Sequence, residues 1–190
     1  MLLLDLSEST NDRVKGFTSI LDIEKQAANL LVQSIDSNFD RLAIDGFHSD
    51  GRSKLHYVRL KEFDEPFDEA QYRLLMGQQG ALSTRMGSAL RHAGFRLQQQ
   101  RVEKRILLLV TDGEPSDIDV TDRDYLVEDA RHVVHYLGMK GITVFGVTLD
   151  KSAGSYMKKI FGPRNFAVVD NALSLPVQLT QILSRIAARN

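Results

Sequence analysis

Three polar segments, far apart in the chain, carry carboxylate and hydroxyl groups suited to binding a metal ion. "DLSEST" and "VTDG" each follow a strongly apolar run, and "STRMGSAL" lies between them. Their candidate ligands are all hard oxygen donors, with no histidine or cysteine among them. Such a set favours Mg²⁺, allows Mn²⁺ or Ca²⁺, and argues against zinc. The predicted ligands of this divalent cation are Asp5, Ser7, Ser9, Thr84 and Asp112.

The first segment also has a simpler interpretation that needs no metal ion. Ser7 and Ser9 can cap a following helix, and Asp5 can be a solvent-facing residue at the end of a strand. Helix capping does not explain why a second buried strand also ends in a carboxylate, nor why a threonine segment lies between the two. The three segments together therefore favour the metal site.

Alternating strands and helices must position these groups. Short apolar or alternating runs predict strands, and apolar residues spaced for one face predict helices. The pattern indicates an α/β fold: a Rossmann-like, doubly wound, mostly parallel sheet with one antiparallel edge strand and helices on both faces. Strands are expected at 2–7, 42–49, 53–61, 104–111, 142–150 and 165–170, and helices at about 13–35, 68–76, 84–100, 125–140, 152–161 and 173–188.

The predicted sheet gives the two carboxylates a common location. Asp5 and Asp112 sit at the carboxyl ends of the strands that look most deeply buried. Open parallel sheets bind ligands at that end, near the point where the strand order reverses. If the two strands are neighbours, both carboxylates face one crevice.

Length and composition limit the function classes. The 190 residues suit one domain, residues 1–190, and 43% of them are apolar. The net charge of −1 favours neither nucleic acid nor a membrane surface, and the basic stretch 85–105 is expected to be a solvated helix surface. The absence of cysteine excludes disulfides and agrees with a cytoplasmic protein. No apolar run approaches the roughly 20 residues of a membrane span, and no signal peptide is visible.

The three segments resemble a known family. "DLSEST" resembles the D-x-S-x-S signature of the von Willebrand factor A domain, "STRMGSAL" its threonine segment and "LLLVTDGEPSD" its "TDG" segment. The resemblance implies a metal-ion-dependent adhesion site, in which Ser7, Ser9 and Thr84 bind the ion directly and Asp5 and Asp112 bind directly or through water. A carboxylate of the binding partner completes the coordination. Glu8 stands where most members of the family have glycine.

A closer resemblance is to the carboxy-terminal domain of the CbbO/NorD type, carried by "LLLDLSEST", "TDGEPSDIDV", "YLVEDAR" and "IFGPRNFAVVD". It implies one domain of a longer, non-enzymatic adaptor for a hexameric AAA+ ATPase of the MoxR type. Rubisco is the first expected client, supplying an Asp or Glu ligand in rubisco activation. Activation of nitric oxide reductase is the alternative. A subunit of a metal chelatase is a more distant one.

Other functions have weaker support. A serine hydrolase using Ser7 or Ser9 lacks the G-x-S-x-G elbow and a histidine at a suitable spacing. No glycine-rich phosphate loop occurs, so nucleotide binding by this chain is not expected. The run 117–128 resembles a calcium loop, but Asp122 occupies the place that needs glycine. This run is expected to be a solvated acidic loop beside the ion site.

Overall fold

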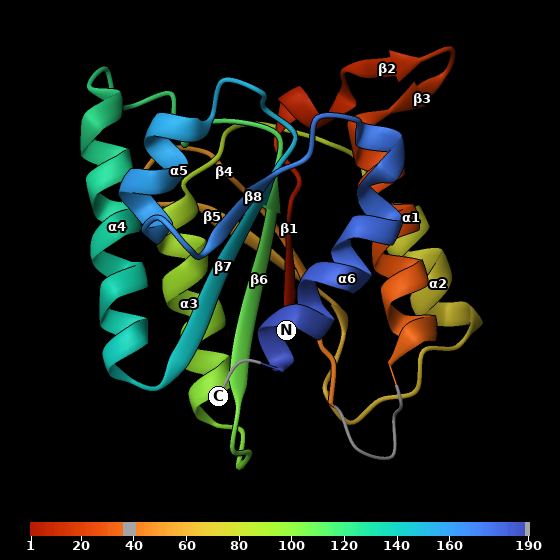
Figure 1. Ribbon diagram of the computed structural model, residues 1–190. Helices are drawn as coiled ribbons and strands as arrows, with labels where there is room; N and C mark the ends of the chain where they lie inside the picture. The colour runs from red at the N-terminus through yellow and green to blue at the C-terminus, as the bar shows by residue number, and fades with distance from the viewer. Residues whose placement is uncertain (36–40, 189–190) are drawn as a thin grey trace.

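The computed structural model describes residues 1–35 and 41–188. Figure 1 shows a central sheet with helices on both faces. The strands of this sheet are β1 (Leu2–Asp5), β4 (Ile44–Ser49), β5 (Leu55–Lys61), β6 (Arg105–Thr111), β7 (Ile142–Thr148) and β8 (Phe166–Val168). The helices are α1 (Ile20–Ser34), α2 (Glu69–Met76), α3 (Met86–Gln98), α4 (Arg123–Met139), α5 (Gly154–Phe161) and α6 (Leu175–Ala187).

The strand order confirms the predicted fold class. It runs β5-β4-β1-β6-β7-β8. β5 is antiparallel to β4 at one edge, and the other neighbouring pairs are parallel. From β1 the chain first builds β4 and β5 on one side, and it later returns to place β6 on the other. The order therefore reverses between β1 and β6, where a ligand site is expected.

The sheet is buried on both faces because successive side chains of a strand point in opposite directions. Leu3 of β1 packs into the core beneath α3, α4 and α5. Leu2 and Leu4 pack into the opposite core, beneath α1 and α6. In Figure 1 these two helix groups lie on the left and right of the sheet. Within the described residues, every helix is too short or too polar to cross a lipid bilayer.

The predicted first helix begins later than expected. Residues 13–19 were predicted to be helical, but they form the antiparallel hairpin of β2 (Arg13–Lys15) and β3 (Thr18–Ser19). Gly16 has a positive φ of 61°, which suits a turn and interrupts a helix. The α-helix α1 starts at Ile20 because Ser19 and Asp22 form a capping box. Phe17, which lies within the predicted helix 13–35, is 91% exposed.

Candidate metal centre

β1 and β6 are neighbours, as the predicted crevice requires. Leu4 pairs with Val110, so Asp5 at the end of β1 and Asp112 directly after β6 lie on adjacent strands at the carboxyl end of the sheet. This end is at the top of Figure 1, where the β2–β3 hairpin also lies. The position of Asp5 differs from the solvent-facing one considered from sequence, because its side chain is completely buried.

Three hydrogen-bond donors make four contacts with the Asp5 carboxylate. Its Oδ1 accepts a hydrogen bond from the Ser7 amide at 3.0 Å, and its Oδ2 accepts one from Thr111 Oγ1 at 2.7 Å. Thr84 Oγ1 lies 3.3 Å from Oδ1 and 3.2 Å from Oδ2. These contacts fix the carboxylate and bring the hydroxyl of Thr84 to it, although 79 residues separate the two in sequence.

A second chain of contacts connects the remaining predicted ligands. Ser7 Oγ lies 3.2 Å from Ser9 Oγ, and Ser9 Oγ donates a hydrogen bond to Asp112 Oδ1 at 3.0 Å. Ser7 is buried, whereas Ser9 is exposed and Asp112 is partly exposed. The cluster therefore extends from a buried carboxylate to the protein surface. The five predicted residues lie together in one cluster of oxygen atoms.

Backbone contacts place the segment that carries Thr84. Ala81 N donates to Leu6 O at 2.8 Å, and Thr84 forms paired backbone hydrogen bonds with Ser116. The segment passes so close to the first loop that a Cβ on Gly80 would lie 2.7 Å from the Ser7 carbonyl oxygen. Gly80 is thus required by a close backbone approach. Leu82, two residues before Thr84, has a positive φ of 61°, a strained conformation for a leucine.

A buried ion-pair network supports the other side of Thr84. Arg85 Nε donates to Asp117 Oδ2 at 2.9 Å, and the guanidinium also pairs with Asp119. Ser49 Oγ donates to Asp117 at 2.8 Å and accepts from the Arg85 amide at 3.0 Å. The predicted solvated surface and solvated acidic loop are wrong here, because Arg85 and Asp117 are each only 7% exposed. Their opposite charges explain how both are buried.

The carboxylates of the cluster lack such a partner. Among the described residues, no lysine or arginine forms an ion pair with Asp5 or Asp112. Burial, and then the charge of Asp112, raise the pKa of Asp5 to about 6. Burial also raises the pKa of Asp112, against the effect of its hydrogen bond from Ser9. The two acids therefore form a site of uncompensated negative charge.

The donor set fits a hard divalent cation. Within residues 1–35 and 41–188, no three His, Asp or Glu side chains lie close enough together to hold a metal ion by themselves. An ion here would need the hydroxyls of Ser7, Ser9 and Thr84 beside the two carboxylates. Oxygen ligands of this kind suit Mg²⁺, Mn²⁺ or Ca²⁺. Glu8, the residue that replaces the usual glycine, is exposed and is not part of the hydrogen-bonded cluster.

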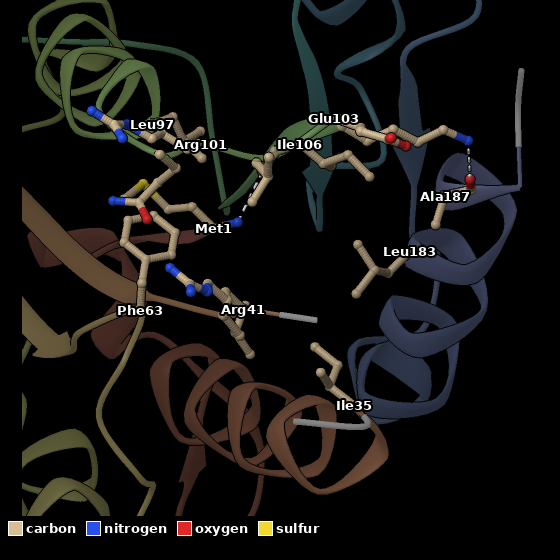
Figure 2. A pocket seen from close by; sticks show the side chains of 14 residues that line it. Met1, Ile35, Arg41, Phe63, Leu97, Arg101, Glu103, Ile106, Leu183 and Ala187 are labelled. Carbon is tan, nitrogen blue, oxygen red and sulfur yellow. Dashed lines mark hydrogen bonds between the residues drawn. The ribbon is translucent and has the colours of Figure 1, made fainter. Parts of the chain in front are cut away.

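A cavity at the other end of the sheet contains none of the predicted ligands. It has a volume of about 550 Å³ and lies around Met1, Phe63 and Ile106. Figure 2 shows Arg41 and Arg101 beside it, together with Leu183 of α6. Its walls are largely apolar and carry no pair of carboxylates, so it does not resemble the metal centre.

Sequence reasoning missed residues that connect the site to the fold. Thr111 was noted only as part of "TDG", yet its hydroxyl donates to Asp5. Arg85, Asp117 and Ser49 were not assigned to the site at all. The position of Arg85 directly after Thr84 was the sequence signal that could have indicated this buried ion-pair network.

Comparisons with known proteins identify the family of the chain. The model of the von Willebrand factor type A domain family matches residues 1–114. This is more than half of the chain. The chain belongs to the von Willebrand factor type A domain family. The A domain is 37% identical over 186 residues to Protein NorD of Brucella melitensis biotype 1, a match that covers 98% of the chain and 29% of that protein. It therefore spans less than a third of the length of this relative.

Solved structures share the fold of this A domain. The PilB minor pilin of Streptococcus sanguinis superimposes with a TM-score of 0.69 at 13% identity, over 97% of the A domain and 61% of that chain. The manganese-loaded TRAP protein of Plasmodium vivax gives 0.63 at 17% identity, over 94% and 71%. At such low identity these likenesses concern the fold alone.

Proposed function

We propose that this A domain is a protein-binding module whose contact with its partner depends on a divalent cation. Asp5, Ser7, Ser9, Thr84 and Asp112 hold the ion, with Mg²⁺ as the first candidate and Mn²⁺ or Ca²⁺ as alternatives. The observation that carries this proposal is the convergence of these oxygen donors around the buried Asp5 and the partly exposed Asp112, which form no ion pair with a cation among the described residues.

The partner is proposed to supply a carboxylate as a further ligand. Two acids roughly balance a divalent ion, and three neutral hydroxyls add no charge. If either acid binds through water, the ion keeps more attraction for an outside anion. Hard cations prefer oxygen, so Asp or Glu of the partner fits better than His or Cys. The ion when bound would therefore supply electrostatic attraction, and the A domain would orient it towards the surface at Ser9 and Asp112.

Exposed apolar side chains near this end of the sheet would add contact area. Phe17 on the β2–β3 hairpin is 91% exposed, and the Arg13 guanidinium lies 5.6 Å from the centre of its ring. Ile118 of the loop after β6 is 75% exposed, and Leu82 beside Thr84 is 45% exposed. Aromatic and arginine side chains are enriched in protein interfaces. These residues suit a partner surface in which one acid is surrounded by apolar groups.

The names of the relatives favour nitric oxide reductase over rubisco as the proposed client. Similarity to a protein named NorD supports membership of the NorD type, and we propose that the longer protein acts as an adaptor for an AAA+ ATPase of the MoxR type. Nitric oxide reductase becomes the first proposed client, ahead of rubisco, because relatives named NorD include those of Brucella melitensis and Stutzerimonas stutzeri. No observation on this chain favours a metal chelatase.

We expect no hydrolytic activity from this A domain. Within the described part of the chain, no histidine hydrogen-bonds to Ser7 or Ser9. His48 instead stacks on His56, with ring centres 4.6 Å apart, and His92 packs against Tyr57. Ser7 is buried and shares its hydroxyl contact with Ser9. Among the described residues, the serines therefore lack the histidine that acts as general base in a serine hydrolase.

Binding of the full-length protein to candidate clients tests the proposal. Purified nitric oxide reductase is tested as the first candidate and rubisco as the second. The client is expected to bind in Mg²⁺ and to be released in EDTA. Asp5→Asn should abolish Mg²⁺-dependent binding, whereas Glu69→Gln, at an exposed residue of α2, should not. Single Asp→Asn and Glu→Gln changes on the bound client should identify one acid. If no client acid matters while EDTA still removes binding, the ion is structural and the partner docks elsewhere.

A further inference from the structure

The predicted ligand Thr84 lies outside the regular elements, in the connection between α2 and α3. Its backbone pairs with Ser116 after β6, and the backbone of Ser83 pairs with Ser49 at the end of β4. Each bridge is isolated, so the connection is attached to its neighbours at single points. The position of the Thr84 hydroxyl, 3.2 Å from Asp5 Oδ2, therefore depends on how these neighbouring segments hold it.

Four side chains reinforce this attachment and form what we call the Arg85 clasp: Ser49, Arg85, Asp117 and Asp119. Oδ2 of Asp117 accepts hydrogen bonds from Ser49 Oγ and Arg85 Nε at 2.8 and 2.9 Å. Its Oδ1 accepts two more, from the backbone amides of Gly51 and Ile118 at 2.9 and 2.7 Å. Each oxygen of this carboxylate thus has two donors, which fix its orientation.

The clasp connects three segments that are far apart in the chain. Ser49 lies at the end of β4, and Gly51 lies in the turn before β5. Asp117 lies in the loop between β6 and α4. Arg85 directly follows Thr84, and its amide donates to Ser49 Oγ at 3.0 Å. Both the backbone and the guanidinium of Arg85 are therefore held, which also restricts the preceding residue.

Stability alone is a poor reason for burying these charges. Replacing a buried ion pair such as Arg85–Asp117 by apolar groups of similar volume is often neutral or even stabilising. An arginine differs from an apolar side chain because its planar guanidinium donates hydrogen bonds in defined directions. The clasp therefore suits a role in which the exact position of Thr84 matters.

We propose that Arg85, Asp117 and Ser49 are positioning residues of the ion site, which hold Thr84 beside Asp5 and so increase affinity for the cation without contacting it. This inference rests on the proposed ion-dependent function. Mg²⁺ requires near-ideal octahedral geometry with oxygen atoms at about 2.0–2.1 Å, so a ligand that moves lowers affinity. Substituting a residue that orients a metal ligand typically weakens metal binding by about 10- to 100-fold.

Charge separates this role from two alternatives. If the clasp only stabilises the fold, folded variants bind the ion as the natural protein does. If its charges act on the ion at long range, Arg85→Gln should strengthen cation binding, since it removes a positive charge, and Asp117→Asn should weaken it. Positioning predicts that both changes weaken binding, because each one opens the clasp.

Calorimetric titration of the full-length protein with MgCl₂ and with MnCl₂ is the test. Arg85→Gln and Asp117→Asn should each weaken ion affinity by roughly 10-fold or more. Arg91→Gln, which breaks an exposed ion pair on the same helix, is the matched control for charge and should leave the affinity unchanged. Ile182→Ala, at a buried position of α6, lowers stability away from the clasp and should also leave it unchanged.

Amide hydrogen exchange in EDTA gives a readout that needs no ion. The amides of Ser83 and Thr84 donate to Ser49 O and Ser116 O at 3.0 and 2.8 Å. Both amides should exchange faster in the two clasp variants, because the connection then opens more often. In Ile182→Ala they should exchange as in the natural protein.

The possible outcomes separate this inference from the proposed function. If the natural protein binds the ion and either folded clasp variant binds it with unchanged or higher affinity, the positioning role is wrong and the ion site stands. If the natural protein binds neither cation, the proposed function fails, and unchanged exchange at Thr84 would then overturn the role of the clasp as well. If one variant does not fold, Arg85→Lys replaces it: this change keeps the charge but not the planar guanidinium, and it should also weaken binding.

Discussion

Two groups of acidic side chains lie on either side of the Thr84–Arg85 segment, and they are compensated differently. Asp117 and Asp119 pair with the guanidinium of Arg85. Asp5 and Asp112, in contrast, receive only hydroxyl and amide hydrogen bonds in the described structure. One group therefore has its cation within the chain, and the other has none.

The pKa values follow this difference. Hydrogen bonds from Ser49 and Arg85 lower the pKa of Asp117, although burial opposes them. The same kind of burial raises the pKa of Asp5 to about 6 because no cation offsets it. Burial alone thus does not identify a functional acid. A buried acid that has no paired cation among the described residues indicates an external ligand more strongly than burial alone does.

The largest expected effect comes from breaking the internally paired group. Asp117→Ala leaves Arg85 buried without its main partner, and loss of one member of a buried pair typically costs about 3–5 kcal/mol. We expect the free energy of unfolding, measured with urea, to fall by roughly this amount. The change should also weaken Mg²⁺ binding, because Arg85 adjoins Thr84. A loss below about 1 kcal/mol would show that the network is dispensable.

A rise in pH should change the contributions of Asp5 and of Asp117 to the stability of the fold in opposite directions. The pKa of Asp5 is about 6 in the fold, above its ordinary value of 3.8, so protonation of Asp5 stabilises the fold at low pH. This contribution is lost as pH rises from about 4 to 6, and its size is roughly 2–3 kcal/mol. The pKa of Asp117 is lowered, so its contribution is present above its unfolded-state pKa and is lost as pH falls through its folded-state pKa.

Urea unfolding in EDTA between pH 4 and 7 measures the first of these effects. Stability should decrease over this range, and saturating Mg²⁺ should reduce the decrease because the cation stabilises the charged acids. Asp5→Asn should flatten the same profile. A stability that increases steadily from pH 4 to 6 in EDTA would contradict the uncompensated charge at Asp5.

Neutralising Asp5 should have a smaller effect on stability. Asp5→Asn removes a buried charge near Asp112 but weakens hydrogen bonds from Ser7 and Thr111. At pH 7 in EDTA we expect a net stabilisation of about 1–2 kcal/mol, together with loss of Mg²⁺ binding. Calorimetry and urea unfolding on the same sample report both quantities. A destabilised variant with unchanged ion affinity would place Asp5 outside the ion site.

The smallest effect is expected at an exposed ion pair. Arg91 Nη2 lies 2.9 Å from Asp129 Oδ1, and the Arg91 side chain is 57% exposed. Exposed pairs of this kind contribute about 0–1 kcal/mol. Arg91→Ala should therefore shift the unfolding midpoint only slightly and leave Mg²⁺ affinity unchanged. A loss comparable to that of Asp117→Ala would remove the distinction between buried and exposed pairs.

The sequence predicted the sheet because its strands are marked by local patterns. The continuous apolar runs before Asp5 and Asp112 indicated buried strands, which the structure places side by side, and β5 showed the alternation of a hairpin partner. The β2–β3 hairpin was missed because Phe17 is spaced suitably for the apolar face of a helix. Gly16 and the Ser19–Asp22 capping box were readable signals against that assignment.

Of the candidate metal centre, only the residues within the three motif segments were predicted from the sequence. The structure brings together the five predicted residues, which lie in three short segments with recognisable spacing. The Arg85–Asp117 pair depends on packing between distant parts of the chain, and nothing in the spacing of single residues reveals it. Arg85 and Asp117 were predicted to be solvent-exposed because most charged residues are.

Binding of a cation to the cluster is the central claim, and diffraction tests it most directly. Crystals of the A domain grown in MnCl₂ and measured near the manganese absorption edge should show one anomalous peak bounded by Asp5, Ser7, Ser9, Thr84 and Asp112. Replacing Mn²⁺ with Mg²⁺ should give oxygen distances of about 2.0–2.1 Å at the same position. Absence of a peak there, with Asp5 and Asp112 well ordered, would contradict the account.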